Sequence, residues 1–113
     1  MRRGKVVGMV EQTAVVLPAR VDVATSAEVR TMLHTALDEG TGDLVVDLRA
    51  VEQVDAAGLG VLVGARRRAH GDGRAMVLRS TPPRVRRILA ATRLKRLFVV
   101  EGDVPGSGRA PVA

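Results

Sequence analysis

Short apolar runs alternate with stretches of helical periodicity along the 113-residue chain. Four runs that are apolar at successive positions predict strands at residues 13–17, 44–48, 75–78 and 97–100. A weaker run at 5–10, interrupted by Gly8, predicts an edge strand. Apolar positions at helical spacing predict three helices, which follow Thr25, Asp55 and Thr81.

The resulting order, β-β-α-β-α-β-α-β, predicts an α/β fold, because strands that alternate with helices pair in parallel through right-handed crossovers. We expect a mostly parallel sheet with an antiparallel N-terminal edge strand. Continuous apolar runs are typical of strands covered on both faces. A face without helices is therefore expected to serve self-association, which would make the chain a homodimer. The predicted organisation is one domain over residues 1–101, followed by a flexible tail at 102–113.

Capping signals mark the ends of the predicted helices. Thr25 and Glu28 have the spacing of a capping box at the first helix. At the third helix, Thr81 is the expected N-cap and Pro82 the first helical residue. Asp55 lies at the mouth of the middle helix, where a carboxylate accepts hydrogen bonds from free N–H groups and faces the positive end of the helix dipole.

The formal net charge of +6 comes mainly from arginine. Basic proteins attract nucleic acid, anionic membranes or acidic proteins. One aromatic residue, Phe98, is too few for base stacking, and no zinc-finger, helix-turn-helix or RNP pattern occurs. Nucleic acid is therefore a disfavoured partner. The alternative, one basic face, would combine Arg66, Arg67, Arg68, Arg84, Arg86, Arg87, Arg93, Lys95 and Arg96.

Targeting signals and catalytic motifs are both missing from the sequence. No run approaches the roughly 18 apolar residues of a membrane span, and the first residues lack a signal core, so we expect a cytoplasmic chain without a membrane partner. There is no cysteine, nucleophile elbow, P-loop lysine or dinucleotide fingerprint. His34 and His70 lack partners at metal-ligand or triad spacing and are interpreted as solvent-facing. Gly60 and Gly64 are interpreted as sites of close helix packing. We expect no enzyme activity, catalytic residue, metal or cofactor.

Two aspartates suggest a binding site. Asp22 and Asp55 each follow an apolar run, and groups beyond the carboxyl ends of parallel strands share one edge of a sheet. We therefore expect Asp22 and Asp55 to lie together. The alternative, slightly favoured for each residue taken alone, is that Asp22 caps a turn and Asp55 caps a helix. Asp47, inside its strand, is interpreted as structural.

The segment from Val45 to Ala65, V-V-D-L-R-A-V-E-Q-V-D-A-A-G-L-G-V-L-V-G-A, resembles the STAS domain of bacterial anti-sigma-factor antagonists. The pattern of that family is an apolar strand, Asp-Leu, a spacer, then Asp-Ser-Ser/Ala-Gly-Leu-Gly and an apolar helix. Asp47-Leu48 and residues 55–60 occupy those places. The resemblance spans about residues 5–101 and includes residues 19–22, the helix at 83–89 and Leu97-Phe98, although Ala19 replaces a glycine of the family.

This resemblance implies a module that docks on a serine-kinase-type anti-sigma factor and promotes release of a sigma factor. In the family the phosphoacceptor directly follows the aspartate, and here that position is Ala56, which has no hydroxyl. The implied docking surface comprises Asp22, Asp55, Ala56, Ala57, Gly58, Leu59, Gly60 and Val63. The apolar run at 59–63 supports this surface because it is too apolar for a helix with one wet side, although core packing also explains part of it. Two alternatives stay open: a STAS subunit of another signalling or transport assembly, and a basic protein that binds nucleic acid or an anionic surface.

Overall fold

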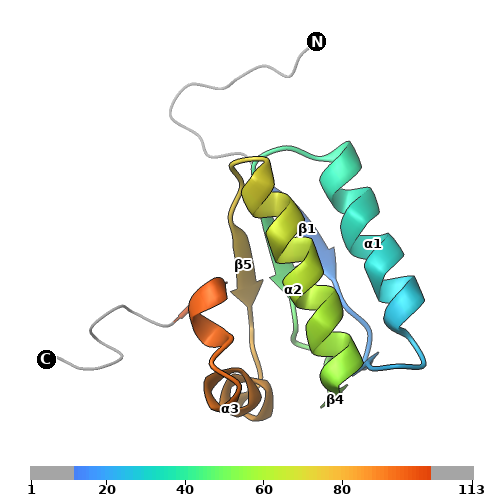
Figure 1. Cartoon of the computed structure of the whole chain (residues 1–113), viewed down its shortest axis with the longest axis vertical. Helices are drawn as coiled ribbons and strands as arrows, with labels where there is room; N and C mark the ends of the chain where they lie inside the picture. The colour runs from blue at the N-terminus through green and yellow to red at the C-terminus, as the bar shows by residue number, and fades with distance from the viewer. Residues whose placement is uncertain (1–11, 103–113) are drawn as a thin grey trace, which may run out of the picture.

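The structure is a computed structural model that describes residues 12–102, in which helices lie over a β-sheet (Figure 1). Its elements are β1 (Gln12–Val16), β2 (Arg20–Val21), α1 (Ser26–Glu39), β3 (Asp43–Asp47), β4 (Gln53–Val54), α2 (Ala56–Gly71), β5 (Met76–Arg79), α3 (Pro83–Ala91), the 3₁₀ helix η1 (Lys95–Leu97) and β6 (Val99–Val100). The predicted α/β class is confirmed. The predicted edge strand at 5–10 and residues 103–113 of the predicted tail lie outside the described residues.

The main sheet has the strand order β1-β3-β5-β6, and every pair in it is parallel. Each crossover steps in the same direction across the sheet, so right-handed connections bring the helices to the same face. In Figure 1, α1 and α2 lie side by side in front of the sheet, and α3 lies below, near the carboxyl ends of the strands. A second sheet, which the sequence did not predict, pairs β2 with β4 in parallel.

The core lies between the helices and one face of the main sheet. The central strands contribute Leu44, Val46, Met76 and Leu78 to it. The residues between them point to the opposite face, where Val45 is fully buried and the other apolar side chains are half-buried or exposed: Ala14, Val16, Val77 and Val99. Within residues 12–102, the three α-helices pack on the core face and not on this second face. The continuous apolar runs reflect a second apolar face instead, at which Val16 and Val99 are 45% and 54% exposed.

The start of α1 differs from the sequence prediction. Thr25 is the N-cap, but its side chain makes no capping hydrogen bond. The Thr25 hydroxyl instead donates to the carbonyl oxygen of Arg20 at 2.9 Å. The predicted capping box with Glu28 is not formed, because the turn that precedes α1 already uses the Thr25 hydroxyl.

The last elements are also shifted. The N-cap of α3 is Pro82 and the helix begins at Pro83, one residue later than predicted, while Thr81 is buried. The predicted strand at 97–100 is reduced to Val99–Val100, because the chain first makes a 3₁₀ turn. Within residues 12–102, no helix has the length and apolar character needed to cross a bilayer.

Candidate docking site

The small sheet brings Asp22 and Asp55 together. Val21 of β2 pairs with Val54 of β4, so the aspartates that follow these residues leave the sheet side by side. The backbone N–H of Asp55 then donates to the carbonyl oxygen of Val21 at 3.3 Å. The two carboxylates therefore share one edge through a strand pair that was too short to recognise in the sequence.

Asp55 connects two segments of backbone. One carboxylate oxygen accepts from the N–H of Gly58 in the first turn of α2, at 2.9 Å. The other accepts from the N–H of Val23 in the loop before α1, at 3.0 Å. The carboxylate also lies at the positive end of the α2 dipole. Asp55 thus fixes the β2–α1 loop against the mouth of α2.

Asp22 organises the turn in front of α1. One of its oxygens accepts from the N–H groups of Ala24 and Thr25 at 3.0 and 3.2 Å. The other accepts from Arg20 Nε at 2.8 Å. This hydrogen bond from the Arg20 guanidinium is the main reason why the pKa of Asp22 lies below its usual value, and burial opposes it. Both aspartates therefore act as caps, and their oxygens are already engaged.

The predicted docking residues of α2 differ in exposure. Ala56 and Gly60 are exposed, whereas Ala57, Leu59 and Val63 are half-buried. Leu59 and Val63 also pack against the core, so core packing explains much of the apolar run. The accessible part of α2 near its mouth is therefore the stripe of Ala56 and Gly60.

Gly58, another predicted docking residue, is buried and packs closely against β2. A Cβ atom at this position would lie 1.9 Å from the carbonyl oxygen of Val21. The first turn of α2 therefore rests directly on the backbone of β2. Gly60 and Gly64 differ, because a Cβ at either would have nothing within 4 Å. The interpretation of Gly60 and Gly64 as helix-packing positions is wrong.

Val23, which the sequence analysis did not select as a site residue, lies beside the N-terminal end of α2. Its side chain is 73% exposed, the largest value among the exposed large apolar residues. Its N–H is the group that Asp55 holds, so this apolar side chain stands beside the α2 mouth. In the sequence it looks like the end of an apolar run, which gives no signal that it faces solvent.

A hollow of about 330 Å³ lies next to the aspartates. It connects them with α3, and its lining residues are Asp22, Glu52, Gln53, Val54, Asp55, Arg84 and Ile88. Arg84 Nη1 donates to the carbonyl oxygen of Glu52 at 2.9 Å, which ties α3 to the chain just before β4. The site thus extends from α2 to the basic third helix.

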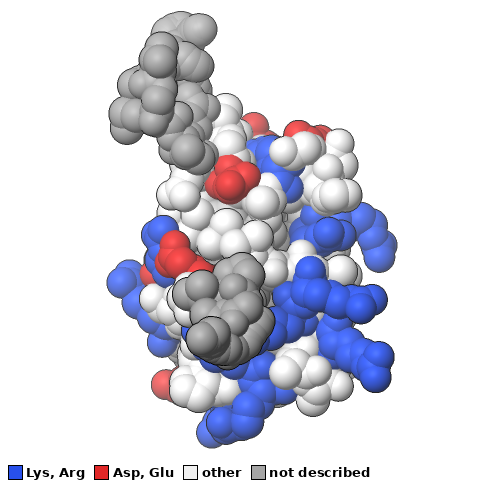
Figure 2. All heavy atoms as spheres, turned by 90° about the vertical axis from the view of Figure 1, so that its left-hand side faces the viewer, with Lys and Arg blue, Asp and Glu red and all other residues white. Residues whose placement is uncertain are grey.

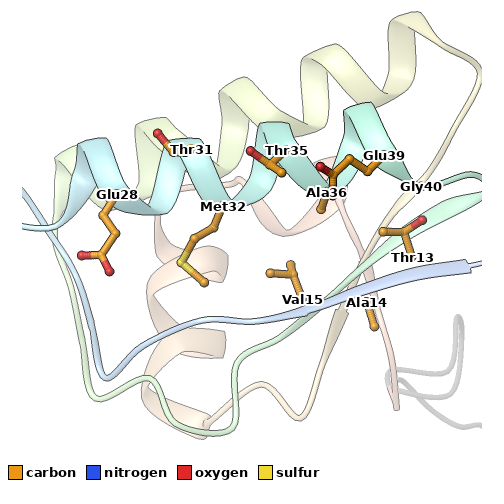
Figure 3. Close-up of a pocket in the computed structure, with 10 residues that line it drawn as sticks. All are labelled: Thr13, Ala14, Val15, Glu28, Thr31, Met32, Thr35, Ala36, Glu39 and Gly40. Carbon is orange, nitrogen blue, oxygen red and sulfur yellow. The ribbon is translucent and has the colours of Figure 1, made fainter.

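A larger groove of about 790 Å³ separates α1 from β1 (Figure 3). In it Met32 and Val15 point toward each other, while Glu28 and Glu39 lie near its two ends. None of the predicted docking residues lines this groove. It borders the outer strand of the described sheet, directly after the residues that the structure does not describe.

The histidines are not arranged for chemistry. His70 is exposed, but His34 is half-buried, and its Nδ1 lies 3.2 Å from Nη1 of Arg68. The interpretation of His34 as solvent-facing is therefore wrong, because α1 and α2 pack together there. Among the described residues, no three histidine or acidic side chains are grouped so that they could hold a metal ion.

The fold and the site define a small α/β domain that exposes the N-terminal end of its middle helix. Residues 7–101 match the family model described as "Mlab, STAS domain". The chain therefore belongs to the STAS domain family.

Solved structures with the same fold include proteins of different roles. A Thermotoga maritima protein assigned as a candidate anti-sigma factor antagonist is 21% identical, with a TM-score of 0.69 and 84% of each chain covered. The Bacillus anti-sigma factor antagonist SpoIIAA, in its unphosphorylated form, is 18% identical, with a TM-score of 0.66; the match covers 94% of this chain and 95% of that chain. A sulfate transporter family protein from Wolinella succinogenes is 15% identical, with a TM-score of 0.68; the match covers 80% of this chain and 76% of that chain. At these identities the likeness establishes the fold alone.

Proposed function

We propose that the chain is an anti-sigma-factor antagonist-like binding module. It docks on a serine-kinase-type anti-sigma factor through the N-terminal end of α2 and promotes release of a sigma factor. Membership of the STAS family and the Asp-Ala-Ala-Gly-Leu-Gly segment support this proposal. The observation that carries it is the exposure of Ala56 at the α2 mouth, directly after the capping Asp55.

The docking surface combines rigid backbone with small side chains. Asp55 and Asp22 hold the loop and the helix start in place, while Val23, Ala56 and Gly60 offer apolar contact area with little steric hindrance. A phosphate at position 56 would bring a charge of about −1.5 to −2 next to Asp55. Because alanine cannot accept a phosphate, the module stays permanently available for docking. The role is non-catalytic.

The test uses the serine-kinase-type anti-sigma factors encoded in the same genome, purified and titrated by calorimetry. The wild-type chain is expected to bind one of them equally well with and without ATP. The Ala56→Ser variant should bind without ATP and lose binding as the kinase phosphorylates it. Transfer of label from ATP to wild-type Ser80 or Thr81 would contradict the absence of a switch, and failure of every kinase to bind would contradict the function.

A second candidate is a STAS subunit of a transport assembly. The likeness to the Wolinella sulfate transporter family protein favours it. Under this alternative, the chain purified from its own cells would remain bound to a transporter subunit and no kinase would bind. The third hypothesis is binding to nucleic acid. Under this hypothesis, the affinity for nucleic acid would fall steeply between low and moderate salt concentration.

A further inference from the structure

The third helix carries an unusual concentration of positive charge. Figure 2 shows Lys and Arg side chains gathered over the lower half of the face nearest α3, with few acidic side chains among them. The exposed basic residues of this region are Arg84, Arg87, Arg93, Lys95 and Arg96. Arg87, Arg93 and Arg96 form no ion pair with any residue in the described range 12–102. Their charges are thus available to a partner.

One stripe of α3 faces the hollow beside the aspartates. Arg84, Ile88 and Ala91 follow each other at helical spacing, and Arg87 adjoins this stripe. Arg84 and Ile88 line the hollow together with Val54, Asp22 and Asp55. The stripe is therefore continuous with the α2 mouth rather than a separate patch.

We propose that this stripe of α3 is the second half of the docking surface and binds an acidic segment of the protein partner that also carries an apolar side chain. The apolar side chain enters the hollow against Val54 and Ile88, and the acidic residues lie over Arg84 and Arg87. The inference rests on the proposed function, because it assigns the chemistry of the partner at the same site.

Charge and shape favour a protein segment over nucleic acid. A sugar-phosphate backbone has no apolar group to place against Val54 and Ile88, whereas a protein segment can place an apolar side chain in the hollow. The aromatic ring of Phe98 is buried and cannot stack on a base. In a protein segment with an apolar side chain between acidic residues, the apolar side chain can contact Val54 and Ile88 while the acidic residues pair with Arg84 and Arg87.

The experiment measures association and dissociation rates with the immobilised kinase-type anti-sigma factor, at about 50 mM and about 500 mM salt. Arg87→Glu should slow association about 3- to 10-fold at low salt and much less at high salt, because screening removes steering by exposed charges. Ile88→Ala should mainly speed dissociation. The matched control is Arg67→Glu, which makes the same charge change at an exposed position of α2, roughly 18 Å from Asp55 along the helix.

The outcomes separate this inference from the proposed function. If Ala56→Glu abolishes kinase binding while Arg87→Glu behaves like Arg67→Glu, the docking function stands and the α3 assignment is overturned. If Arg87→Glu weakens binding to a 20-base-pair DNA duplex at physiological salt but leaves kinase binding unchanged, the stripe is a nucleic-acid surface and the assignment is again overturned. If no kinase binds the wild-type chain, the proposed function and the α3 assignment are both rejected.

Discussion

Gly58 and Gly60 stand two residues apart on α2, and the structure predicts opposite effects of alanine at the two positions. Replacing an exposed helical glycine with alanine stabilises a helix by roughly 1 kcal/mol, because glycine loses more backbone freedom on folding. At Gly60 nothing lies within 4 Å of the added methyl group, so the full gain is expected. At Gly58 the methyl carbon would lie 1.9 Å from the backbone oxygen of Val21, and neither atom can rotate away.

The cost at Gly58 is therefore that of overpacking, about 1–3 kcal/mol or more, set against the same helix gain. Moving α2 away would also stretch the hydrogen bond from Asp55 to Val21 and loosen the loop that Asp55 holds. Because the helix gain is common to both variants, they should differ by the overpacking cost alone, roughly 1–3 kcal/mol or more in free energy of unfolding. Since 1 kcal/mol corresponds to about 4–8 °C in Tm for a domain of this size, the difference in Tm should be at least about 4 °C.

Urea unfolding followed by far-ultraviolet circular dichroism measures this difference, because the chain has no tryptophan or tyrosine for fluorescence. Gly64→Ala is the matched control, since its Cβ also meets nothing. Gly60→Ala and Gly64→Ala should both be more stable than wild type, but only Gly60→Ala should weaken docking of the kinase. Equal stability of Gly58→Ala and Gly60→Ala would refute the close approach of α2 to β2.

Three further predictions concern other parts of the molecule. Val23→Asp should leave the free energy of unfolding within about 0.5 kcal/mol of wild type, because the side chain is exposed. The same change should weaken kinase binding, measured by calorimetry, at least about tenfold. Unchanged affinity would show that Val23 is not part of the docking surface. The pKa of the Asp22 carboxyl is lowered from 3.8, chiefly by Arg20, so ionised Asp22 stabilises the fold above that pH and this stabilisation is lost as the pH falls through the lowered pKa. The urea midpoint of Asp22→Asn should therefore fall less between pH 5 and pH 2.5 than the midpoint of wild type. Equal falls of the two midpoints with pH would contradict the ion pair. If the uncovered sheet face self-associates, sedimentation should show a dimer that the double variant Val16→Lys and Val99→Lys abolishes, and a wild-type monomer at all concentrations would reject the self-association.

Local signals in the sequence were sufficient for the main elements. The apolar run at Leu44–Leu48 and the helical stripe of Val29, Leu33 and Leu37 each bury the residues that their spacing selects. Asp55 caps α2 as expected, because a carboxylate at that place satisfies free N–H groups whatever surrounds the helix. These features depend on neighbours within a few residues, which is why one sequence was enough to find them.

The remaining features depend on contacts between distant segments. The pairing of β2 with β4 involves two residues on each strand, separated by about thirty positions, and so leaves no periodic pattern. The Thr25 hydroxyl was diverted from capping by a carbonyl of the preceding turn. A continuous apolar run also cannot distinguish a strand between two helix layers from one that has helices on a single face. Each error arose where tertiary contacts outweighed a local preference.

The two interpretations of the aspartates, as caps and as part of a binding site, turn out to be complementary. Because the oxygens of Asp55 accept hydrogen bonds from Gly58 and Val23, this residue holds together the backbone of the proposed docking surface. Position 56 has a different role, since an exposed side chain at the first helical position supports none of these hydrogen bonds. A hydroxyl can therefore be lost there without structural cost, while the loss of Asp55 would dismantle the rim. Under the proposed function, this separation explains how a STAS domain with alanine at position 56 keeps its docking surface without a phosphorylation switch.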